Sequence, residues 1–177
     1  MVSGDTVTES GVRGAFIGLF IATGAAMLGF GLIEPIMPLY AESLGASSLM
    51  LGVIFAGFAV TRGIFAPIMG RLSDRYGRKR ILLAGLGLYV LLSAAYILAN
   101  SPLTLTAVRA SQGLASVMVT PIAQSYVGDI TPEGSEGTIT NLFYVSLFGG
   151  IAVGPTLGGY LNDHYGLSMP FYVMAAL

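Results

Sequence analysis

The residues of this chain that could do chemistry are few, and three of them are charged side chains in apolar surroundings. Glu34, Arg62 and Arg109 each stand within a long apolar segment. An ionisable side chain in such a segment is costly unless it faces water, a partner or a ligand, so it is a candidate functional residue. Counted along their helices, Glu34 and Arg109 have about the same depth from one membrane face. We therefore expect them to face one cavity, where the carboxylate can change partner when it takes up a proton.

Each of these residues also has a plainer interpretation. Glu34, next to Pro35 and Pro38, could be an interfacial acid exposed to outside water. Arg109 could extend along its helix to the outer interface. Arg62, deeper on the inner side, could have a structural role, pair with a second half of the protein or bind an anionic substrate.

The composition argues against an enzyme, a metal site and a nucleic-acid-binding protein. The chain has no cysteine and one histidine, His164, so clusters of soft metal ligands are not expected. We find no nucleophile with a matching base and no phosphate-binding loop, and we predict no catalytic residues and no cofactor. A net charge of −1 does not favour nucleic acid as a partner.

The hydrophobic content places the chain in a membrane. Of its 177 residues, 54% are hydrophobic and 10% charged, whereas about 25% of a typical soluble domain is charged. Residues 14–33 form an uncharged run long enough to span a bilayer. Asp5 and Glu9 precede that run where a cleavable signal would carry positive charge, so we interpret it as a retained anchor.

Six transmembrane helices are expected, in an all-α fold. Their approximate ranges are 13–40, 49–70, 81–99, 103–126, 137–161 and 168–177. The sixth contains only about ten residues, or about 15 Å of helix, which is half of a membrane span. We therefore expect a tail, residues 1–12, followed by a six-helix bundle over residues 13–177 that is truncated in its sixth helix.

The basic residues predict the orientation of this bundle. Two of the eight, Arg62 and Arg109, lie within spans, and the other six fall on one side of the alternating helices. These six are Arg13, Arg71, Arg75, Arg78, Lys79 and Arg80. By the positive-inside rule this side, with the N-terminus, is cytoplasmic.

An internal repeat relates the two halves of the bundle. Residues 70–77 read G-x-L-x-D-x-Y-G, and residues 159–166 repeat that pattern 89 positions later. Each copy follows a P-x-x-G segment. Three spans separate the copies, which must therefore lie on opposite membrane faces. An inverted three-plus-three repeat is an architecture of transporters, whose binding sites lie near the bilayer midplane.

Residues 70–80, GRLSDRYGRKR, resemble the loop between the second and third helices of the major facilitator superfamily. The resemblance extends over essentially the whole chain and implies half of a twelve-helix or longer transporter working by alternating access. It also implies that Asp74, Arg78 and Asp129 form a charge network that latches the outward-facing state. The remaining residues of this gating loop are Gly70, Arg75, Gly77 and Lys79. From the residues alone, Asp74 would lie near the start of the third helix, and the loop could equally be a solvated positive-inside loop.

Two further segments are similar to segments of this family. Residues 105–113, with Arg109 and Gln112, resemble the fourth-helix segment of proton-coupled members. The fifth helix contains G-x-x-x-G-P-x-x-G-G, which resembles the segment that marks antiporters, although its glycines could form a plain packing ridge. Its residues are Gly150, Gly154, Pro155, Gly158 and Gly159.

The sequence favours a proton-coupled antiporter that exports drugs or metabolites. Its expected partners are membrane lipid, protons, a small-molecule substrate and a second six-helix half, and its expected location is the plasma (inner) membrane. The alternatives are a facilitator or symporter of small organic solutes and a non-transporting six-helix assembly partner. Soft or aromatic side chains could line an apolar cavity or face lipid. They are Met27, Phe30, Met37, Phe55, Phe58, Met118 and Phe143.

Overall fold

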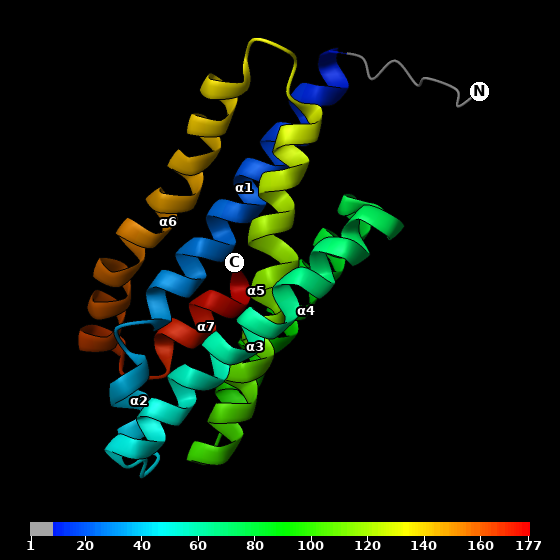
Figure 1. Cartoon of the computed structure of the whole chain (residues 1–177). Helices are drawn as coiled ribbons and strands as arrows, with labels where there is room; N and C mark the ends of the chain where they lie inside the picture. Colours follow the sequence, from blue (N-terminus) through cyan, green and yellow to red (C-terminus); the bar gives the residue numbers. More distant parts are fainter. Residues whose placement is uncertain (1–8) are drawn as a thin grey trace.

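A computed structural model describes residues 9–177, with side chains from Arg13 onward, as helices joined by short turns (Figure 1). The helices are α1 (Glu9–Ile33), α2 (Met37–Ser43), α3 (Ser48–Tyr76), α4 (Arg78–Leu98), α5 (Pro102–Ile130), α6 (Glu136–Tyr165) and α7 (Met169–Ala176). Most of the expected tail, residues 1–12, lies outside the described residues.

Four of these helices are long and apolar enough to cross a membrane: α1 from Arg13, α3, α4 and α6. The fifth long helix, α5, has 29 residues and would measure about 43 Å. It is less apolar because it carries Arg109, Gln112 and Ser116 in its buried face. The sixth expected span is represented by α7. The prediction of an all-helical membrane bundle is confirmed for the part of the chain described.

The prediction of one continuous first span is wrong at its C-terminal end. α1 ends at Ile33, a turn follows, and α2 begins at Met37. Pro35 has no N–H to donate, and the Ile36 N–H donates instead to the carbonyl of Ile33, at 3.1 Å. This break leaves Glu34 at the end of a helix rather than in its middle.

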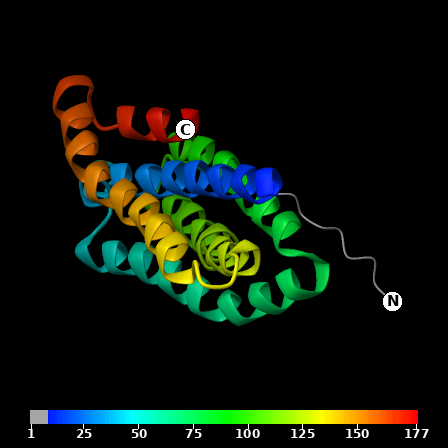
Figure 2. The same cartoon turned by 90° about the horizontal axis from the view of Figure 1, so that it is seen from above.

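The inverted repeat is visible in how the helices pair. α1 packs along α6 and α3 packs along α5, which are the two most extensive pairs (Figures 1 and 2). The two copies of the repeated motif end their helices alike, because Gly77 and Gly166 take positive φ values of 95° and 91°. Each glycine N–H donates at 2.9 Å to a carbonyl four residues earlier. Only glycine adopts this conformation at no steric cost, which explains why both copies end in glycine.

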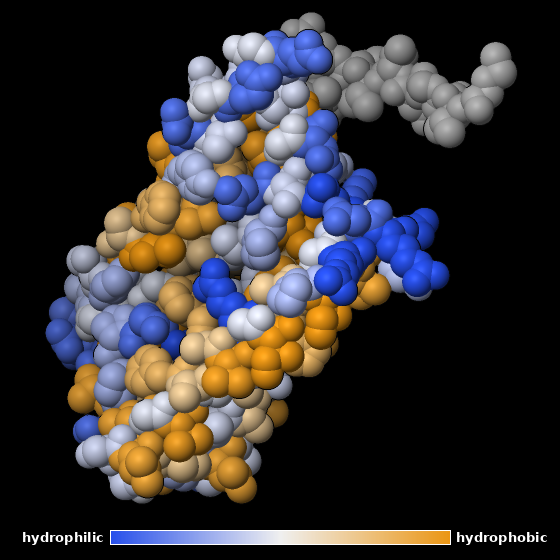
Figure 3. Space-filling model, in the orientation of Figure 1, coloured by the Kyte–Doolittle hydropathy of each residue, from blue (hydrophilic) through white to orange (hydrophobic). Residues whose placement is uncertain are grey.

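Two clusters of buried apolar side chains hold the bundle together, one toward α2 and one toward the opposite end. The end that carries Arg13, Arg71, Arg75, Arg78, Lys79 and Arg80 is called the basic end here. In Figure 3 hydrophilic side chains gather at the right, where α3 ends and α4 begins, and hydrophobic side chains cover much of α3 below them. Exposed apolar residues such as Ile21 and Val60 suit a surface that meets lipid or further protein rather than water.

Candidate functional site

Arg109 lies at the centre of the site, and its side chain is completely buried. It projects from the third turn of α5, and one terminal nitrogen forms an ion pair with the carboxylate of Glu34, directly after the end of α1. The other terminal nitrogen donates to Gln112 Oε1 at 2.8 Å. A fully buried side chain does not reach the outer interface, so the interpretation of Arg109 as an interfacial residue is wrong.

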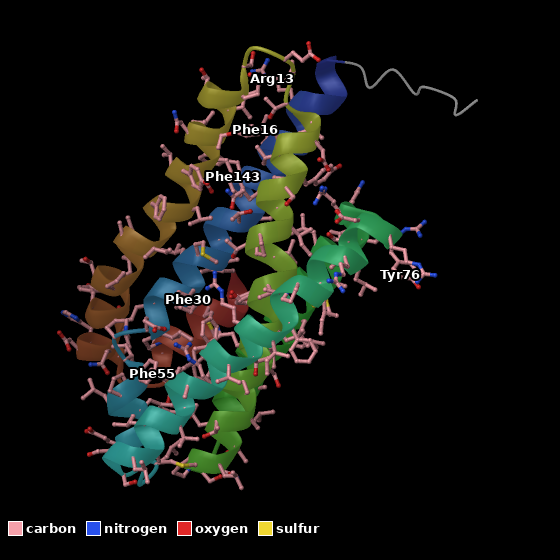
Figure 4. The ribbon with its side chains drawn as sticks, in the orientation of Figure 1. Arg13, Phe16, Phe30, Phe55, Tyr76 and Phe143 are labelled. Atoms are coloured by element: carbon pink, nitrogen blue, oxygen red, sulfur yellow. The ribbon has the colours of Figure 1, made fainter. Side chains whose placement is uncertain are left out.

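Three aromatic rings surround the same guanidinium. Its central carbon lies 5.5 Å from the ring centre of Phe30 on α1, and 5.5 and 4.9 Å from those of Phe55 and Phe58 on α3. Figure 4 shows Phe30 and Phe55 at the level where α1, α3 and α5 come together. Ring faces attract a cation, most strongly where water is excluded. The arginine is therefore held by rings as well as by a carboxylate.

Gln112 connects this pair to α4. Its Oε1 accepts from Arg109 and also from the hydroxyl of Tyr96, which lies 2.6 Å away. Tyr96 and Gln112 are almost completely buried. Arg109 and Gln112 are three residues apart and so share one face of α5. The Tyr96 hydroxyl thus completes a chain of polar contacts that runs from Glu34 through Arg109 and Gln112.

Glu34 differs from Arg109 in its access to solvent. Its side chain is 39% exposed, against 0% for its partner. The carboxylate therefore pairs with the buried arginine and remains accessible at the same time. Arg109 Nε has no hydrogen-bond partner among the described residues.

Arg62 lies on α3, apart from this pair. It is exposed in the described chain and lines a cavity of about 100 Å³ together with Phe30, Tyr89, Ser116 and Thr120. None of the ion pairs between described residues includes Arg62.

At the basic end, the expected charge network is assembled. Arg78 pairs with Asp129, in the last turn of α5, and its other nitrogen lies 3.3 Å from the Asp74 carboxylate. Asp74 stands in the last turn of α3 rather than near the start of the next helix, so that expectation is wrong. The helix continues past Gly70 to Tyr76, and Gly77 alone makes the turn.

The other loop residues surround this network. Arg75, Gly77 and Lys79 line a hollow of about 650 Å³ with Asp74, Arg78 and Asp129. The Arg75 guanidinium lies 5.4 Å from the ring centre of Tyr76. Gly70 lies one turn before Asp74 and borders a neighbouring cavity of about 240 Å³.

The glycine motif of α6 packs directly against α1. A Cβ atom on Gly154 would lie 2.6 Å from Gly31 Cα, and one on Gly150 would lie 2.7 Å from the carbonyl oxygen of Gly24. A Cβ atom on Gly158 would likewise clash with the carbonyl oxygen of Leu32.

The remaining residues of the motif lie outside that contact. Pro155 is exposed, and Gly159 has no atom within 4 Å of an added Cβ. The motif thus divides into a ridge of three glycines on α6 that packs against α1, and two residues outside that contact.

The candidate cavity residues fall into two groups. Phe30, Phe55 and Phe58 surround Arg109 as described, and Met27 lines the small cavity beside Arg62. Met37 and Phe143 are completely buried in the two apolar clusters, so neither a cavity nor a lipid-facing position is correct for them. Met118 is half-buried and packs on α4 near Gly85.

Tyr96 and Tyr89 were missed from the sequence. A tyrosine in an apolar helix carries no charge, and neither tyrosine is part of a motif that would mark it as functional. Tyrosine also occurs often in protein cores. The one available signal is that the two are seven residues apart and therefore share a face of their helix.

Comparison with known proteins identifies the family of the chain. The family model of the Major Facilitator Superfamily matches residues 19–177. An uncharacterised MFS-type transporter of Methanocaldococcus jannaschii is 39% identical over 154 residues, covering 87% of this chain and 40% of that protein. Multidrug resistance protein 2 of Bacillus subtilis is 30% identical, covering 92% and 40%. Quinolone resistance protein NorA of Staphylococcus aureus is 32% identical, covering 85% and 38%.

Among solved structures, the human organic anion transporter MFSD10 (TETRAN) matches with a TM-score of 0.74 at 20% identity, covering 93% of this chain and 45% of that one. At that identity the match concerns the fold. The chain spans about 40% of the length of the curated relatives it matches.

Proposed function

The chain belongs to the Major Facilitator Superfamily, and from this we propose that it forms the N-terminal half of a proton-coupled antiporter exporting drugs or metabolites. Two relatives are named for multidrug and quinolone resistance, which supports drug-like substrates. A second six-helix half would complete the central cavity, because alternating access needs two bundles that move against each other. The proposed location is the cell membrane, with the basic end and the N-terminus in the cytoplasm.

One observation carries the proton-coupled part of this proposal: a completely buried arginine is paired with a half-exposed carboxylate. Removing one partner of a buried ion pair costs roughly 3–5 kcal/mol. Since Glu34 is 39% exposed, the effect here lies toward or below the lower end of that range. It remains a large part of the about 5.5 kcal/mol that moves a two-state equilibrium from 1:99 to 99:1.

The proton cycle follows from this asymmetry. A proton arriving from the outer side reaches the accessible carboxylate of Glu34 and neutralises it, and the ion pair is lost. Arg109 stays charged, held by Gln112 and the three rings, and its freed N–H groups turn to the cavity or to the second half. When the proton leaves toward the cytoplasm, Glu34 pairs with Arg109 again and the cycle can restart.

The other two motifs have mechanical roles in this proposal. The charge network of Asp74, Arg78 and Asp129 holds the cytoplasmic ends of α3, α4 and α5 together in the outward-facing state. The three-glycine ridge keeps α6 locked on α1, so that these helices move as one body. Pro155 weakens the backbone of α6 locally, because it donates no helix hydrogen bond.

Substitution of Glu34 tests the proposal in the complete protein, reconstituted in vesicles with an imposed pH gradient. Glu34→Gln is expected to abolish export of a fluorescent quinolone driven by the gradient, because the side chain no longer titrates. Binding of a neutral drug should survive, which shows that the variant is folded. Glu42→Gln makes the same chemical change at an exposed acid of α2 and should leave export unchanged. Gradient-driven export at the wild-type rate by Glu34→Gln would refute the role of Glu34.

A further inference from the structure

The small cavity beside Arg62 brings together polar side chains from three helices. It has a volume of about 100 Å³, and its polar lining consists of Arg62 from α3, Tyr89 from α4, and Ser116 and Thr120 from α5. The rest of its wall is apolar, with Phe30 among its members. Hydrogen-bond donors and one fixed positive charge therefore converge on a small space enclosed by hydrocarbon.

Tyr89 is the least expected member of this lining. Its side chain comes from α4 and is 6% exposed. Its hydroxyl has no hydrogen-bond partner among the described residues. A buried hydroxyl that forms no hydrogen bond is destabilising. Binding of a ligand that accepts a hydrogen bond from Tyr89 would remove this cost. Ser116, which is 3% exposed, adds a second hydroxyl to the same wall.

Arg62 supplies the charge. In contrast to Arg109, it takes part in no ion pair between described residues and is exposed at the edge of the cavity. A guanidinium with two hydroxyl groups nearby matches a carboxylate, which accepts several hydrogen bonds and binds arginine in a bidentate manner.

We propose that Arg62, Tyr89, Ser116 and Thr120 form a subsite that binds the carboxylate of an amphipathic substrate. The inference rests on the proposed export function and narrows its substrate class. A cavity of about 100 Å³ is smaller than the roughly 300–1,000 Å³ of a typical ligand pocket. The subsite therefore takes one functional group, and the apolar body of the substrate lies in the central cavity.

The position of Phe30 connects this subsite to the proton pair. The ring lines the cavity and is also one of the three rings around Arg109. A substrate carboxylate and the Glu34–Arg109 pair would thus lie on two sides of one aromatic side chain. The bound substrate and the proton would then influence each other through the placement of that ring.

The test compares two probes of matched shape, 1-naphthoate and its neutral amide, by equilibrium binding to the complete protein in detergent. The wild type should bind the carboxylate more tightly. Arg62→Gln should weaken naphthoate binding by roughly ten- to a hundredfold, since a charge-assisted hydrogen bond is lost. Tyr89→Phe should weaken it about fivefold. Both variants should bind the amide within about twofold of the wild type, and Arg62→Lys should restore part of the preference.

Two matched controls remove similar groups elsewhere. Arg13→Gln removes an exposed charge near the start of α1, far from Phe30, which lines the cavity (Figure 4). Tyr160→Phe removes the hydroxyl of an exposed tyrosine. Neither should change naphthoate binding.

Three outcomes would overturn the subsite. They are equal binding of the two probes by the wild type, no binding of naphthoate, and naphthoate affinity that is unchanged or raised in Arg62→Gln. The last result would mean that Arg62 pairs with an acid elsewhere in the complete protein. The proposed export function fails in a different way, by absence of gradient-driven export while the preference for the carboxylate persists.

Discussion

At the residue scale, the buried charge of Arg109 is stabilised both by the Glu34 carboxylate and by three aromatic rings. Only the carboxylate carries an opposite charge; a ring face attracts a cation through its quadrupole, by about 0.5–2 kcal/mol. The three rings therefore position the guanidinium, and the carboxylate neutralises it. This division allows protonation of Glu34 to change the energetics of the site without moving Arg109 out of its place.

Tyr96 positions Gln112 by donating a hydrogen bond to its Oε1, and removal of the Tyr96 hydroxyl tests that role. Tyr96→Phe deletes the neutral one of the two hydrogen bonds to Gln112 Oε1, which is worth about 1 kcal/mol. We expect gradient-driven export to fall about fivefold and to keep its dependence on the pH gradient. The measurement is the initial export rate in vesicles at several imposed gradients. Complete loss of coupling, as predicted for Glu34→Gln, would show that Tyr96 takes part in proton transfer itself.

The sequence predicted that Glu34 and Arg109 face one another, because counting residues along two helices puts them at a similar level, and the two side chains form an ion pair. It did not predict Tyr96, since nothing local to α4 shows that its hydroxyl meets a side chain from α5. Whether Arg109 is buried or reaches the interface also depends on the neighbouring helices. These features arise from the packing of segments that are far apart in the chain.

At the element scale, the contact between α1 and α6 depends on the absence of side chains. Glycine spacing predicted that a ridge exists on the fifth span, but it did not identify α1 as the partner. The proline pair near Glu34 similarly contained the signal for the break after α1. The expected span reaches Tyr40 because the apolar composition continues through the break, and α2 forms that last part as a separate short helix.

Gly154→Ala tests the ridge in the purified complete protein. The new methyl group would lie 2.6 Å from Gly31 Cα, and overpacking of this kind costs roughly 1–3 kcal/mol. We expect a lower apparent melting temperature in detergent. Gly149→Ala is the matched control, because an added Cβ there meets no atom within 4 Å and alanine favours a helix by about 0.5–1 kcal/mol. Equal melting temperatures for the two variants would mean that the ridge does not hold α6.

At the scale of the whole molecule, the Asp74 network lies at the exposed basic end of the described bundle. Asp74 is 64% exposed in its side chain and Arg78 is 26% exposed. Pairs as exposed as this one contribute about 0–1 kcal/mol to stability. The network therefore contributes little to holding the bundle folded, and its effect should appear in the balance between the two facing states.

Asp74→Asn separates these two effects in the complete protein. Expression and membrane insertion should stay close to the wild type because little folding energy is lost. Transport should fall by about tenfold or more, which corresponds to at least about 1.4 kcal/mol in the limiting step. The readouts are protein yield in membranes and the export rate in vesicles. Export by Asp74→Asn at the wild-type rate would contradict a gating role and would support the interpretation of a solvated positive-inside loop.

The start of α4 has a further consequence, for how the chain is made. Arg78, Lys79 and Arg80 follow Gly77 directly and occupy the first turn of α4, where the helix dipole disfavours positive charge by about 0.3–1 kcal/mol for each residue. If these charges orient the nascent chain during insertion, as the proposed topology requires, they do so at the expense of the helix that they begin. Asp74 and Asp129 relieve this conflict for Arg78 only once α3, α4 and α5 have assembled. Membrane insertion therefore favours positive charge in the first turn of α4, whereas the stability of that helix disfavours it. In the folded protein, the carboxylates of Asp74 and Asp129 compensate the charge of Arg78.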